Sequence, residues 1–541
     1  MSYYLEVHNS TEHDGNIALN DDGEITIYLS ERIDRKKHSC NFIALKKYFT
    51  NKTNGYYDLP RKELIYQPFQ EIHHHLAHAC CSFFSSPFDK ATILVLDGMG
   101  PYKNNTYAST SIWQGEGNNI KLISINPERY FSYNSLGHLY SAVTYYCGFD
   151  FWQEGKTMGL ASYGSPSDIS VELNKMVAFL PGGGYTINKD FIGYCFSLKY
   201  LKENIFRKYY AKSANFRAHY EKLIGPARKK HGNIQKSHEN LSWAVQDLLE
   251  KIIFHLITHL KSLKHNNLCI GGGIGLNSVV NAKILQSSIF ENIYIPPVCG
   301  DDGQALGKLL YKKYFIDKKS RNWSMTNAYL GPEDEISDIK AALKFYNKKI
   351  VYKSYEKNEL LRIVAKNLAR GRIIGWFQGR SEIGPRSLGH RSILADPRKA
   401  KMKNIINDRI KHREMFRPFA PSILEEYLND YFYSAVPSPF MLYVFKAKQK
   451  AIKNIPAVVH VDGTSRVQSV NKLDNGIYYD LIQEFYKLTR VPVLLNTSFN
   501  DNGEPIVETP NDAIKAFINQ DLDLLIMENY IVYKKCKYAN Y

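Results

Sequence analysis

The sequence predicts an α/β fold with two or more domains. A chain of 541 residues, 44% of them hydrophobic, can bury more than one core. Patterns typical of strands and of helices alternate up to about residue 315. Residues 318–327 are polar and lack periodicity. We therefore expect a linker there, between one domain at residues 1–325 and another at residues 340–541.

The first elements of the chain are a hairpin and a helix that carries histidines. Asp22 and Gly23 lie between short alternating runs, as in a hairpin turn. Further on, His74 and His78 are four residues apart in an apolar stretch. On a helix this spacing puts both imidazoles on one face, which is a common beginning of a metal site.

Two carboxylates are candidates to complete this metal site. Asp97 ends the apolar run of residues 91–96, a pattern typical of a buried strand followed by a turn. Asp301 is a possible fourth ligand, and its neighbour Asp302 is the alternative. Two neutral histidines with carboxylates suit iron, manganese or zinc and leave positions open for a substrate oxygen. The opposing interpretation is that the histidines are structural.

Two glycine-rich loops are candidates for a nucleotide site. Neither is a Walker loop or a strict dinucleotide fingerprint. The loop at residues 269–277 follows an apolar stretch and precedes a helical pattern, so it suits a phosphate turn, but it also suits a tight strand-to-helix connection. The candidate nucleotide ligands are Lys156, Gly271, Gly272, Gly273 and Asn277.

Between these loops lie a basic segment and a core helix. Residues 199–236 are strongly basic with scattered aromatic residues, and we interpret them as a helical insertion or lid. Residues 241–260 have apolar side chains at helical spacing, which predicts a helix in the core.

The C-terminal half carries clusters typical of an anion site. Residues 379–392 place three arginines among three glycines directly after the strand-like run of residues 373–377. Arginine offers a rigid fork of donors for phosphate or carboxylate, and glycine lets backbone N–H groups approach the same anion. Residues 411–421 add a second basic cluster with interleaved phenylalanine and proline.

Two polar segments follow, at residues 460–468 and 495–500, the second after a strand-like run. Hydroxyls and amides just past a strand end are where α/β sheets usually bind ligands. Each cluster alone suits a surface loop or turn, but the four together favour a polyanion site. The candidate residues are Arg386, Arg391, Lys411, Arg417, Arg466, Asn496 and Ser498.

In this order, these motifs resemble the NodU/TobZ-type O-carbamoyltransferase family. The resemblance starts at residues 13–15 and 30–32, takes in every cluster above and covers nearly the whole chain. It departs from the family at residues 6–12, which replace a small, glycine-rich opening. The resemblance implies an actin-like (ASKHA), Kae1-like domain that carries a metal and transfers the carbamoyl group, at residues 1–325. It also implies a YrdC-like α/β domain that forms carbamoyladenylate, at residues 340–541.

The reaction implied by the resemblance has two stages. Carbamoyl phosphate and ATP, the latter with Mg²⁺, give carbamoyladenylate and pyrophosphate, and a hydroxyl of a natural product or sugar then takes the carbamoyl group. By the family pattern, Arg386 and Lys411 act in catalysis and, with Arg466 and Ser498, grip the carbamoyl and adenylate groups. Arg391, Arg417 and Asn496 support them. The family pattern also implies a metal, Fe²⁺ or alternatively Mn²⁺ or Zn²⁺, on His74, His78, Asp97 and Asp301, and either His13 or Asp14 as acceptor of the hydroxyl proton.

Composition bounds the alternatives. A formal net charge of +17 suits anionic substrates, and equally nucleic acid, so a tRNA or protein carbamoylation factor is the main alternative. Two features disfavour it: the fusion of both modules in one chain, and the segments at residues 462–468 and 496–500, which belong to the small-molecule branch. A non-enzymatic nucleotide-binding protein is a third hypothesis. The acceptor cannot be read from the sequence.

The cysteines and the apolar runs bear on zinc and location. The eight cysteines form no CxxC pair, which disfavours structural zinc and the related hydrogenase maturation protein. The sequence shows neither a signal peptide nor an apolar run long enough to span a bilayer, so we expect a cytoplasmic protein, which could be a homodimer.

Overall fold

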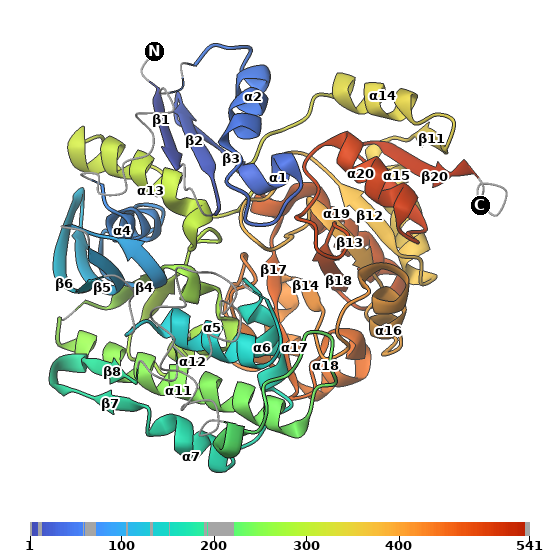
Figure 1. The fold of residues 1–541 in the computed structure, drawn as a ribbon. Coiled ribbons are helices and arrows are strands. Elements are labelled where there is room, and N and C mark those ends of the chain that lie inside the picture. The colour runs from blue at the N-terminus through green and yellow to red at the C-terminus, as the bar shows by residue number, and fades with distance from the viewer. Residues whose placement is uncertain are drawn as a thin grey trace. The chain divides into compact units, whose positions relative to one another are not determined.

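The computed structural model of the chain describes residues 3–8, 13–57, 59, 72–103, 106–129, 134–150, 152–188, 192, 221–263 and 265–535. The chain divides into two compact units (Figure 1). Unit 1 consists of Met1–Gln67, Pro296–Ile316 and Trp323–Tyr541, and unit 2 of Pro68–Ile295 and Asp317–Asn322. The functional division at residues 1–325 and 340–541 follows family resemblance and stays a prediction.

Unit 2 is built on a mixed five-stranded sheet with strand order β10-β9-β4-β5-β6. The strands are β4 (Lys90–Pro101), β5 (Thr106–Glu116), β6 (Asn119–Arg129), β9 (Asn267–Gly271) and β10 (Asn292–Tyr294). β4, β5 and β6 run antiparallel in succession, whereas β9 is parallel to both β4 and β10. The predicted buried strand is therefore confirmed as the first part of β4, whose residues 91–96 are all buried. The turn predicted after Asp97 is wrong: the register shifts between Leu96 and Gly100, and β4 continues to Pro101.

Helices pack against this sheet and against one another. They are α4 (His74–Phe84), α5 (Leu136–Tyr146), α6 (Glu154–Ala161), α7 (Asp168–Asn174), α11 (Lys236–Leu260) and α12 (Ser278–Gln286), beside a small hairpin of β7 (Val177–Phe179) and β8 (Tyr185–Ile187). α4 contacts β4 and β9, and α5 contacts β4. The helix predicted at residues 241–260 is confirmed as most of α11, with Leu241, Val245, Leu248 and Leu249 buried.

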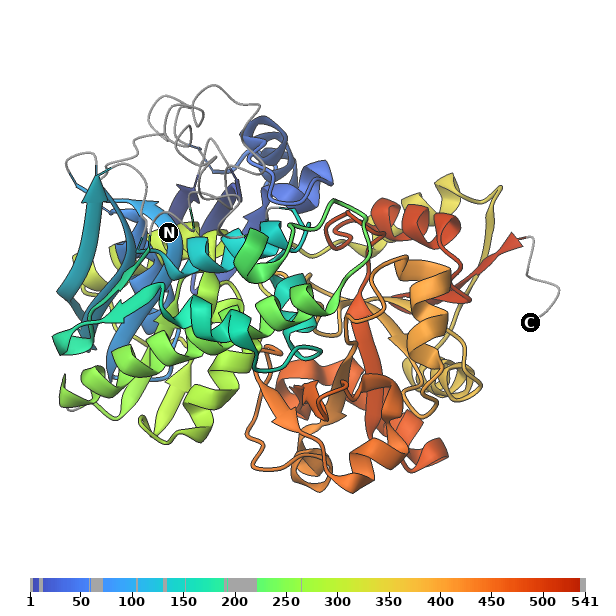
Figure 2. The ribbon, with the colours of Figure 1, turned by 60° about the horizontal axis from the view of Figure 1, so that its bottom comes forward.

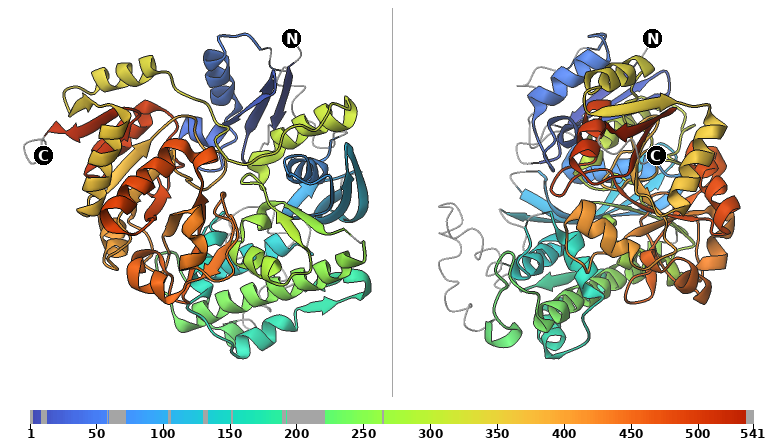
Figure 3. Two further views of the ribbon diagram at one scale, coloured as in Figure 1. Left: turned by 180° about the vertical axis from the view of Figure 1, so that it is seen from behind. Right: turned by 90° about the vertical axis from the view of Figure 1, so that its right-hand side faces the viewer.

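Unit 1 begins with an antiparallel sheet of β1 (Tyr4–His8), β2 (Asn16–Asp21) and β3 (Glu24–Leu29). The predicted hairpin is confirmed, and Asp22 and Gly23 both take positive φ, as the tight turn requires. The sheet is accompanied by α1 (Ser30–Asp34), α2 (Phe42–Lys52) and α13 (Gln304–Leu310). β1–β3, in dark blue, and α2 are seen from behind in Figure 3.

The larger part of unit 1 is an eight-stranded sheet with strand order β11-β20-β19-β12-β13-β18-β14-β17. Its strands are β11 (Ile350–Ser354), β12 (Ile374–Phe377), β13 (Arg391–Ala395), β14 (Ala420–Leu424), β17 (Gln468–Val470), β18 (Val493–Ser498), β19 (Leu524–Met527) and β20 (Tyr530–Lys534). The later strands of this sheet are orange to red in Figure 2. β12–β19 and β14–β17 are parallel pairs, and the other neighbours are antiparallel. The predicted strand at residues 373–377 is confirmed as fully buried β12.

The remaining helices in the described part of unit 1 are α14 (Ile336–Phe345), α15 (Lys357–Ala369), α16 (Met402–Ile406), α17 (Leu428–Tyr431), α18 (Gln449–Asn454), α19 (Lys472–Thr489) and α20 (Pro510–Asn519). They are accompanied by a two-stranded sheet of β15 (Val444–Lys446) and β16 (Thr464–Arg466). α15 packs on α19, and α20 contacts β12 and β19. The mixed α/β class predicted from the sequence is therefore confirmed.

The predicted linker at residues 318–327 contains neither helix nor strand. Its first part is nevertheless attached to unit 2, because Arg321 donates to the carbonyls of Phe83 and Gly117 and stacks on the Phe83 ring. The basic segment predicted at residues 199–236 lies largely outside the described residues. Among the described residues, no helix is long and apolar enough to cross a membrane.

Candidate functional site

One edge of the unit 2 sheet brings together a carboxylate and a glycine turn. β4 and β9 are parallel and pair as far as Val95 and Gly271, so the irregular stretch of β4 after Leu96 and the turn after Gly271 lie at the same edge. Gly273 N donates to Asp97 Oδ1 at 3.2 Å. Gly272 has φ +87°, and a Cβ there would lie 2.1 Å from the carbonyl oxygen of Leu96, so only glycine fits this turn. The glycine loop thus holds the Asp97 carboxylate in place.

The histidines of α4 divide into two kinds. His73 caps the helix by accepting from Leu76 N at 3.3 Å, and burial lowers the pKa of its imidazole to about 4. His75 lies 2.7 Å from Ser111 Oγ and 2.8 Å from the carbonyl of Ala108, and burial lowers its pKa to about 3. Both rings therefore serve the fold as neutral groups.

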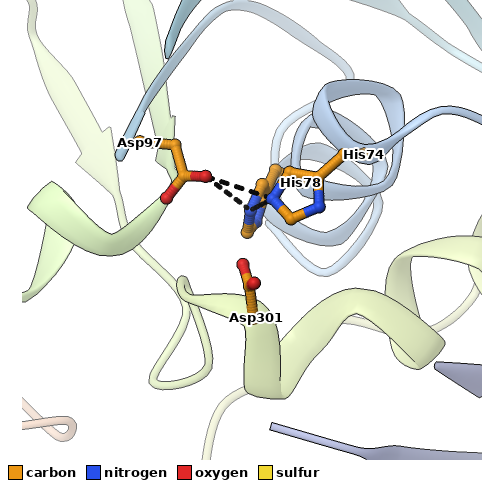
Figure 4. Close-up of side chains that lie close together, drawn as sticks. All are labelled: His74, His78, Asp97 and Asp301. Atoms are coloured by element: carbon orange, nitrogen blue, oxygen red, sulfur yellow. Dashed lines mark hydrogen bonds and ion pairs between the residues drawn. The ribbon is translucent and has the colours of Figure 1, made fainter. Parts of the chain in front are cut away.

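The other two histidines face Asp97 (Figure 4). His74 Nε2 lies 3.0 Å from His78 Nε2 and 3.1 Å from Asp97 Oδ2, and His78 Nε2 lies 3.9 Å from the same oxygen. Two imidazole lone pairs and a carboxylate that converge in this way repel one another unless a proton or a cation lies between them. His74 also approaches β4 closely: a Cβ on Gly100 would lie 2.3 Å from His74 Cδ2. The set has the donor chemistry of a site for a divalent transition metal.

The predicted fourth ligand, Asp301, belongs to unit 1. It begins the 3-10 helix Asp301–Gly303, its carbonyl accepts from Asn16 Nδ2 at 2.9 Å, and its Oδ2 lies 3.5 Å from His13 Nδ1. Burial raises the pKa of the neighbouring Asp302 well above its ordinary value, and the acidic groups of Asp14, Glu31 and Asp301 add to the effect.

His13 and Asp14 form a cluster with His38, a residue that sequence reasoning missed. Asp14 Oδ2 lies 3.2 Å from His13 Nδ1, and Asp14 Oδ1 lies 3.1 Å from His38 Nδ1. Burial alone would raise the pKa of Asp14, but hydrogen bonds from His13 and His38 outweigh it and lower this pKa to about 2. Burial alone would lower the pKa of His38, but the contact with Asp14 outweighs it and raises this pKa. Both Asp14 and His38 have φ +54°, and Glu31 Oε2 accepts from His38 N.

The arginine-rich segment at residues 379–392 comprises the loop between β12 and β13 and the first two residues of β13. It is folded around one carboxylate. Glu382 Oε1 accepts from the backbone N–H groups of Leu388 at 2.7 Å and Arg391 at 3.2 Å. Asn496 fixes the same loop, because its amide donates to the carbonyl of Ser387 at 3.1 Å and its Oδ1 accepts from Ser387 Oγ at 3.2 Å.

Four arginines of unit 1 form a cationic cluster, which we call the arginine cluster: Arg386, Arg413, Arg417 and Arg466. Each is half-buried. Burial, followed by the charge of Arg417, lowers the pKa of Arg386 to about 10, and the same two effects lower that of Arg413 to about 9. For Arg466, burial and the charges of the other three lower the pKa well below its ordinary value, and its buried Nε has no hydrogen-bond partner among the described residues. Like charges that lower one another's pKa in this way are stabilised by a bound anion.

Lys411 adds a fifth cation beside the arginine cluster. Its Nζ donates to the carbonyl and the side chain of Asn500, at 3.0 and 2.6 Å, and to the carbonyl of Ser498 at 2.6 Å. Burial, then the charge of Arg413, lowers the pKa of this amine well below its ordinary value. Lys411 therefore ties the segment after β18 to the cluster.

The other candidate residues have structural partners. Arg391 stacks on Phe377 at 3.5 Å and donates to the carbonyl of Gln378, and Asn277 caps α12 by accepting from Val280 N. Lys156 lies on α6. Their roles in substrate or nucleotide binding stay predictions. Sequence reasoning missed Arg413 as a site residue, although it lies in the basic segment at residues 411–421. The signal is the interleaved Phe419, on whose ring Arg413 stacks.

The comparisons with known proteins agree on one family. The Carbamoyltransferase N-terminus model matches residues 39–310, and the Carbamoyltransferase C-terminus model matches residues 365–534. An uncharacterized protein of Synechocystis, sll1178, is 36% identical over 488 residues, which cover 85% of this chain and 75% of that protein. The nodulation protein NolNO of Sinorhizobium fredii is 36% identical, with 86% of this chain and 64% of NolNO covered. The nodulation protein NolO of Bradyrhizobium diazoefficiens is 34% identical, with 86% and 79% covered.

Proposed function

This chain belongs to the carbamoyltransferase family, and from that premise we propose that it is an O-carbamoyltransferase acting on a hydroxyl of a small molecule. In the first stage, carbamoyl phosphate, ATP and water give carbamoyladenylate, phosphate and pyrophosphate. In the second stage, the acceptor oxygen bonds to the carbamoyl carbon, and AMP leaves. The acceptor is a natural product or a sugar.

The observation that carries the first stage is the arginine cluster. Its four guanidinium groups repel one another, and that repulsion is relieved when phosphates lie between them. Bringing carbamoyl phosphate and ATP together costs electrostatic repulsion that these cations offset, and they also stabilise the charge that develops on pyrophosphate. We assign Arg386, Arg417 and Arg466 to the phosphates. Lys411 orders Ser498 and Asn500 beside them.

The second stage needs a group that accepts the hydroxyl proton. Asp14 is a poor candidate, because a carboxylate with a pKa of about 2 holds a proton weakly. Its contact with His13 Nδ1 instead fixes the tautomer in which His13 Nε2 is the acceptor. We therefore assign the proton to His13, with Asp14 as the group that orients the ring.

The donor set of His74, His78 and Asp97 fits Fe²⁺, Mn²⁺ or Zn²⁺, and we propose Asp301 as the fourth ligand. When bound, the metal supplies a Lewis acid and an anchor for phosphate or carbamoyl oxygen. The chain's own part is to hold these donors rigidly. The glycine loop at Gly271–Gly273 fixes Asp97, and the packing of α4 on β4 fixes both histidines.

The remaining assignments follow the family resemblance. We propose an actin-like, Kae1-like domain at residues 1–325 and a YrdC-like domain at residues 340–541, with Mg²⁺ accompanying ATP. The glycine loop, Asn277 and Lys156 are proposed to contact the nucleotide, and Arg391 and Asn496 to support the carbamoyl site. A cytoplasmic location and the possibility of a homodimer belong to the same proposal.

One assay tests the proposal. The protein is incubated with ATP and ¹⁴C-carbamoyl phosphate, and pyrophosphate release is followed with and without a panel of sugar and polyol acceptors. We expect pyrophosphate only when carbamoyl phosphate is present, and label in the acceptor. Pyrophosphate release that required bicarbonate and threonine in place of carbamoyl phosphate would favour the tRNA-type alternative. No release from either mixture would contradict both.

A further inference from the structure

We propose that Arg32 of α1 is a positioning residue for the arginine cluster: by holding the carbonyl of Gly384, it fixes the loop that presents Arg386. The inference rests on the proposed function only in taking the arginine cluster as a phosphate site. Arg32 lies about 350 residues away from this loop in the sequence, within the motif at residues 30–32 that no other assignment uses.

Arg32 is a buried cation with directed contacts. Its side chain is 1% exposed, and Nη2 donates to the carbonyl of Gly384 at 2.8 Å. Nη1 lies 3.8 Å from Glu508 Oε2, and Nε lies 3.5 Å from Glu31 Oε1. Burying a guanidinium costs free energy, which well-placed hydrogen bonds and an opposite charge offset. The shortest contact of Arg32 is to a neutral backbone oxygen rather than to a carboxylate.

The loop has little freedom where Arg32 holds it. Gly384 has φ +86°, and a Cβ there would lie 2.5 Å from the carbonyl oxygen of Pro297. Two residues later comes Arg386, and the next residue, Ser387, is held on both its side chain and its carbonyl by Asn496. Arg386 thus stands between two anchors, one at Gly384 and one at Ser387. Removing the anchor at Gly384 therefore frees one side of the turn that positions the Arg386 guanidinium in the arginine cluster.

Glu508 provides the means to separate positioning from charge balance. This carboxylate is 4% exposed and accepts from Ser381 Oγ at 2.6 Å. Replacing Arg32 by methionine removes the ion pair of the buried Glu508 with Arg32 and destabilises the fold. The double variant Arg32→Met/Glu508→Gln removes both charges, keeps an acceptor for Ser381, and still lacks the donor to Gly384.

The matched control is Arg35, the residue that caps the C-terminal end of α1. Its guanidinium donates to the carbonyls of Ile506 and Pro505, and it pairs with Glu504 and Asp512. Arg35→Met therefore removes an arginine of similar attachment whose hydrogen bonds and ion pairs within the described part of the chain are to residues 504–512 and not to the loop at Gly384. Arg32→Lys keeps a donor that can reach the Gly384 carbonyl.

The experiment measures pyrophosphate affinity by titration calorimetry and the unfolding midpoint of the full chain for each variant. Arg32→Met should lower both. In Arg32→Met/Glu508→Gln the midpoint should recover, while pyrophosphate binding stays about tenfold or more weaker than in the parent. Arg32→Lys should restore most of the affinity, and Arg35→Met should change the midpoint alone.

Parent-like pyrophosphate affinity in the double variant would overturn the inference, since the effect of Arg32 would then be charge balance only. A parent protein that does not bind pyrophosphate would overturn it as well. Loss of carbamoyl transfer to every acceptor, with these affinities as expected, would contradict the proposed function and leave the role of Arg32 standing.

Discussion

The Nε2 atoms of His74 and His78 lie 3.0 Å apart, and both face Asp97 Oδ2. His75, on the same helix, instead has its Nε2 2.8 Å from the carbonyl of Ala108. Two histidines of one helix that converge on the same carboxylate form a donor set that could hold a metal ion.

Replacing His74 or His78 by alanine should remove the bound metal and abolish carbamoyl transfer, because each replacement removes one imidazole donor and leaves a single histidine beside the carboxylates. Pyrophosphate release should continue, since the arginine cluster lies in unit 1 and uses neither histidine. Metal content is measured by emission spectrometry, beside both activities. His73→Ala is the control: it loses a helix cap, at about 1 kcal/mol, and should keep its metal. Stoichiometric metal in the double histidine variant would contradict the assignment.

Gly272→Ala should weaken metal binding without touching a ligand. The new Cβ would lie 2.1 Å from the Leu96 carbonyl at φ +87°, so the loop that donates to Asp97 must move. We expect a destabilisation of roughly 2–4 kcal/mol, measured by urea unfolding, and a higher metal dissociation constant. At Gly273, in the same loop, an added Cβ would lie 3.5 Å from Asp97 Oδ1, an ordinary contact. Gly273→Ala should therefore be the milder change, and equal effects of the two would argue against this account of the loop.

The Asp14 carboxylate should make the free energy of unfolding depend on pH in the acid range. Its pKa is about 2 in the folded protein against an ordinary 3.8, so the ionised group stabilises the fold above about pH 4, and this contribution fades as the pH falls to about 2. The shift corresponds to about 2 kcal/mol. Urea unfolding from pH 2 to 7 should show Asp14→Asn to be less stable than the parent at pH 6 and nearly equal to it at pH 2. Asp22→Asn makes the same chemical change at an exposed turn and controls for it. A constant difference across this range would contradict the shift.

How much of this arrangement the sequence predicts depends on the distance between the residues involved. The i, i+4 spacing of His74 and His78, and the end of an apolar run at Asp97, are local patterns, and the structure brings these three side chains together. The helix at residues 241–260 and the hairpin at Asp22 follow from local periodicity and turn chemistry as well.

The residues that sequence reasoning missed depend on long-range contacts. His38 meets Asp14 across 24 residues, because two turns with positive φ come together, and no periodicity announces such a pair. Arg32 meets Gly384 across 352 residues. The sequence also does not distinguish a polar residue that binds substrate from one that holds the fold. Asn496 was a predicted substrate ligand, and in the structure its amide donates to the carbonyl of Ser387. Whether it also touches substrate stays a prediction.

Arg386 decides whether the arginine cluster is the site of adenylate formation. Its guanidinium lies in a half-buried cluster of like charge, where a phosphate contact is worth about 3 kcal/mol, or on the order of a hundredfold in rate. Arg386→Ala should lower pyrophosphate release by at least that factor. Arg386→Lys keeps the charge but loses the bidentate fork, so it should remain strongly impaired.

Arg380 is the matched control, because it lies in the same loop and is engaged by Glu24 and by the carbonyls of Gly331 and Ile25. Arg380→Lys should cost stability more than rate. Metal content should be unchanged throughout, and transfer from chemically supplied carbamoyladenylate should suffer less than its synthesis. Normal pyrophosphate release by Arg386→Ala would move the adenylate-forming site elsewhere in the chain.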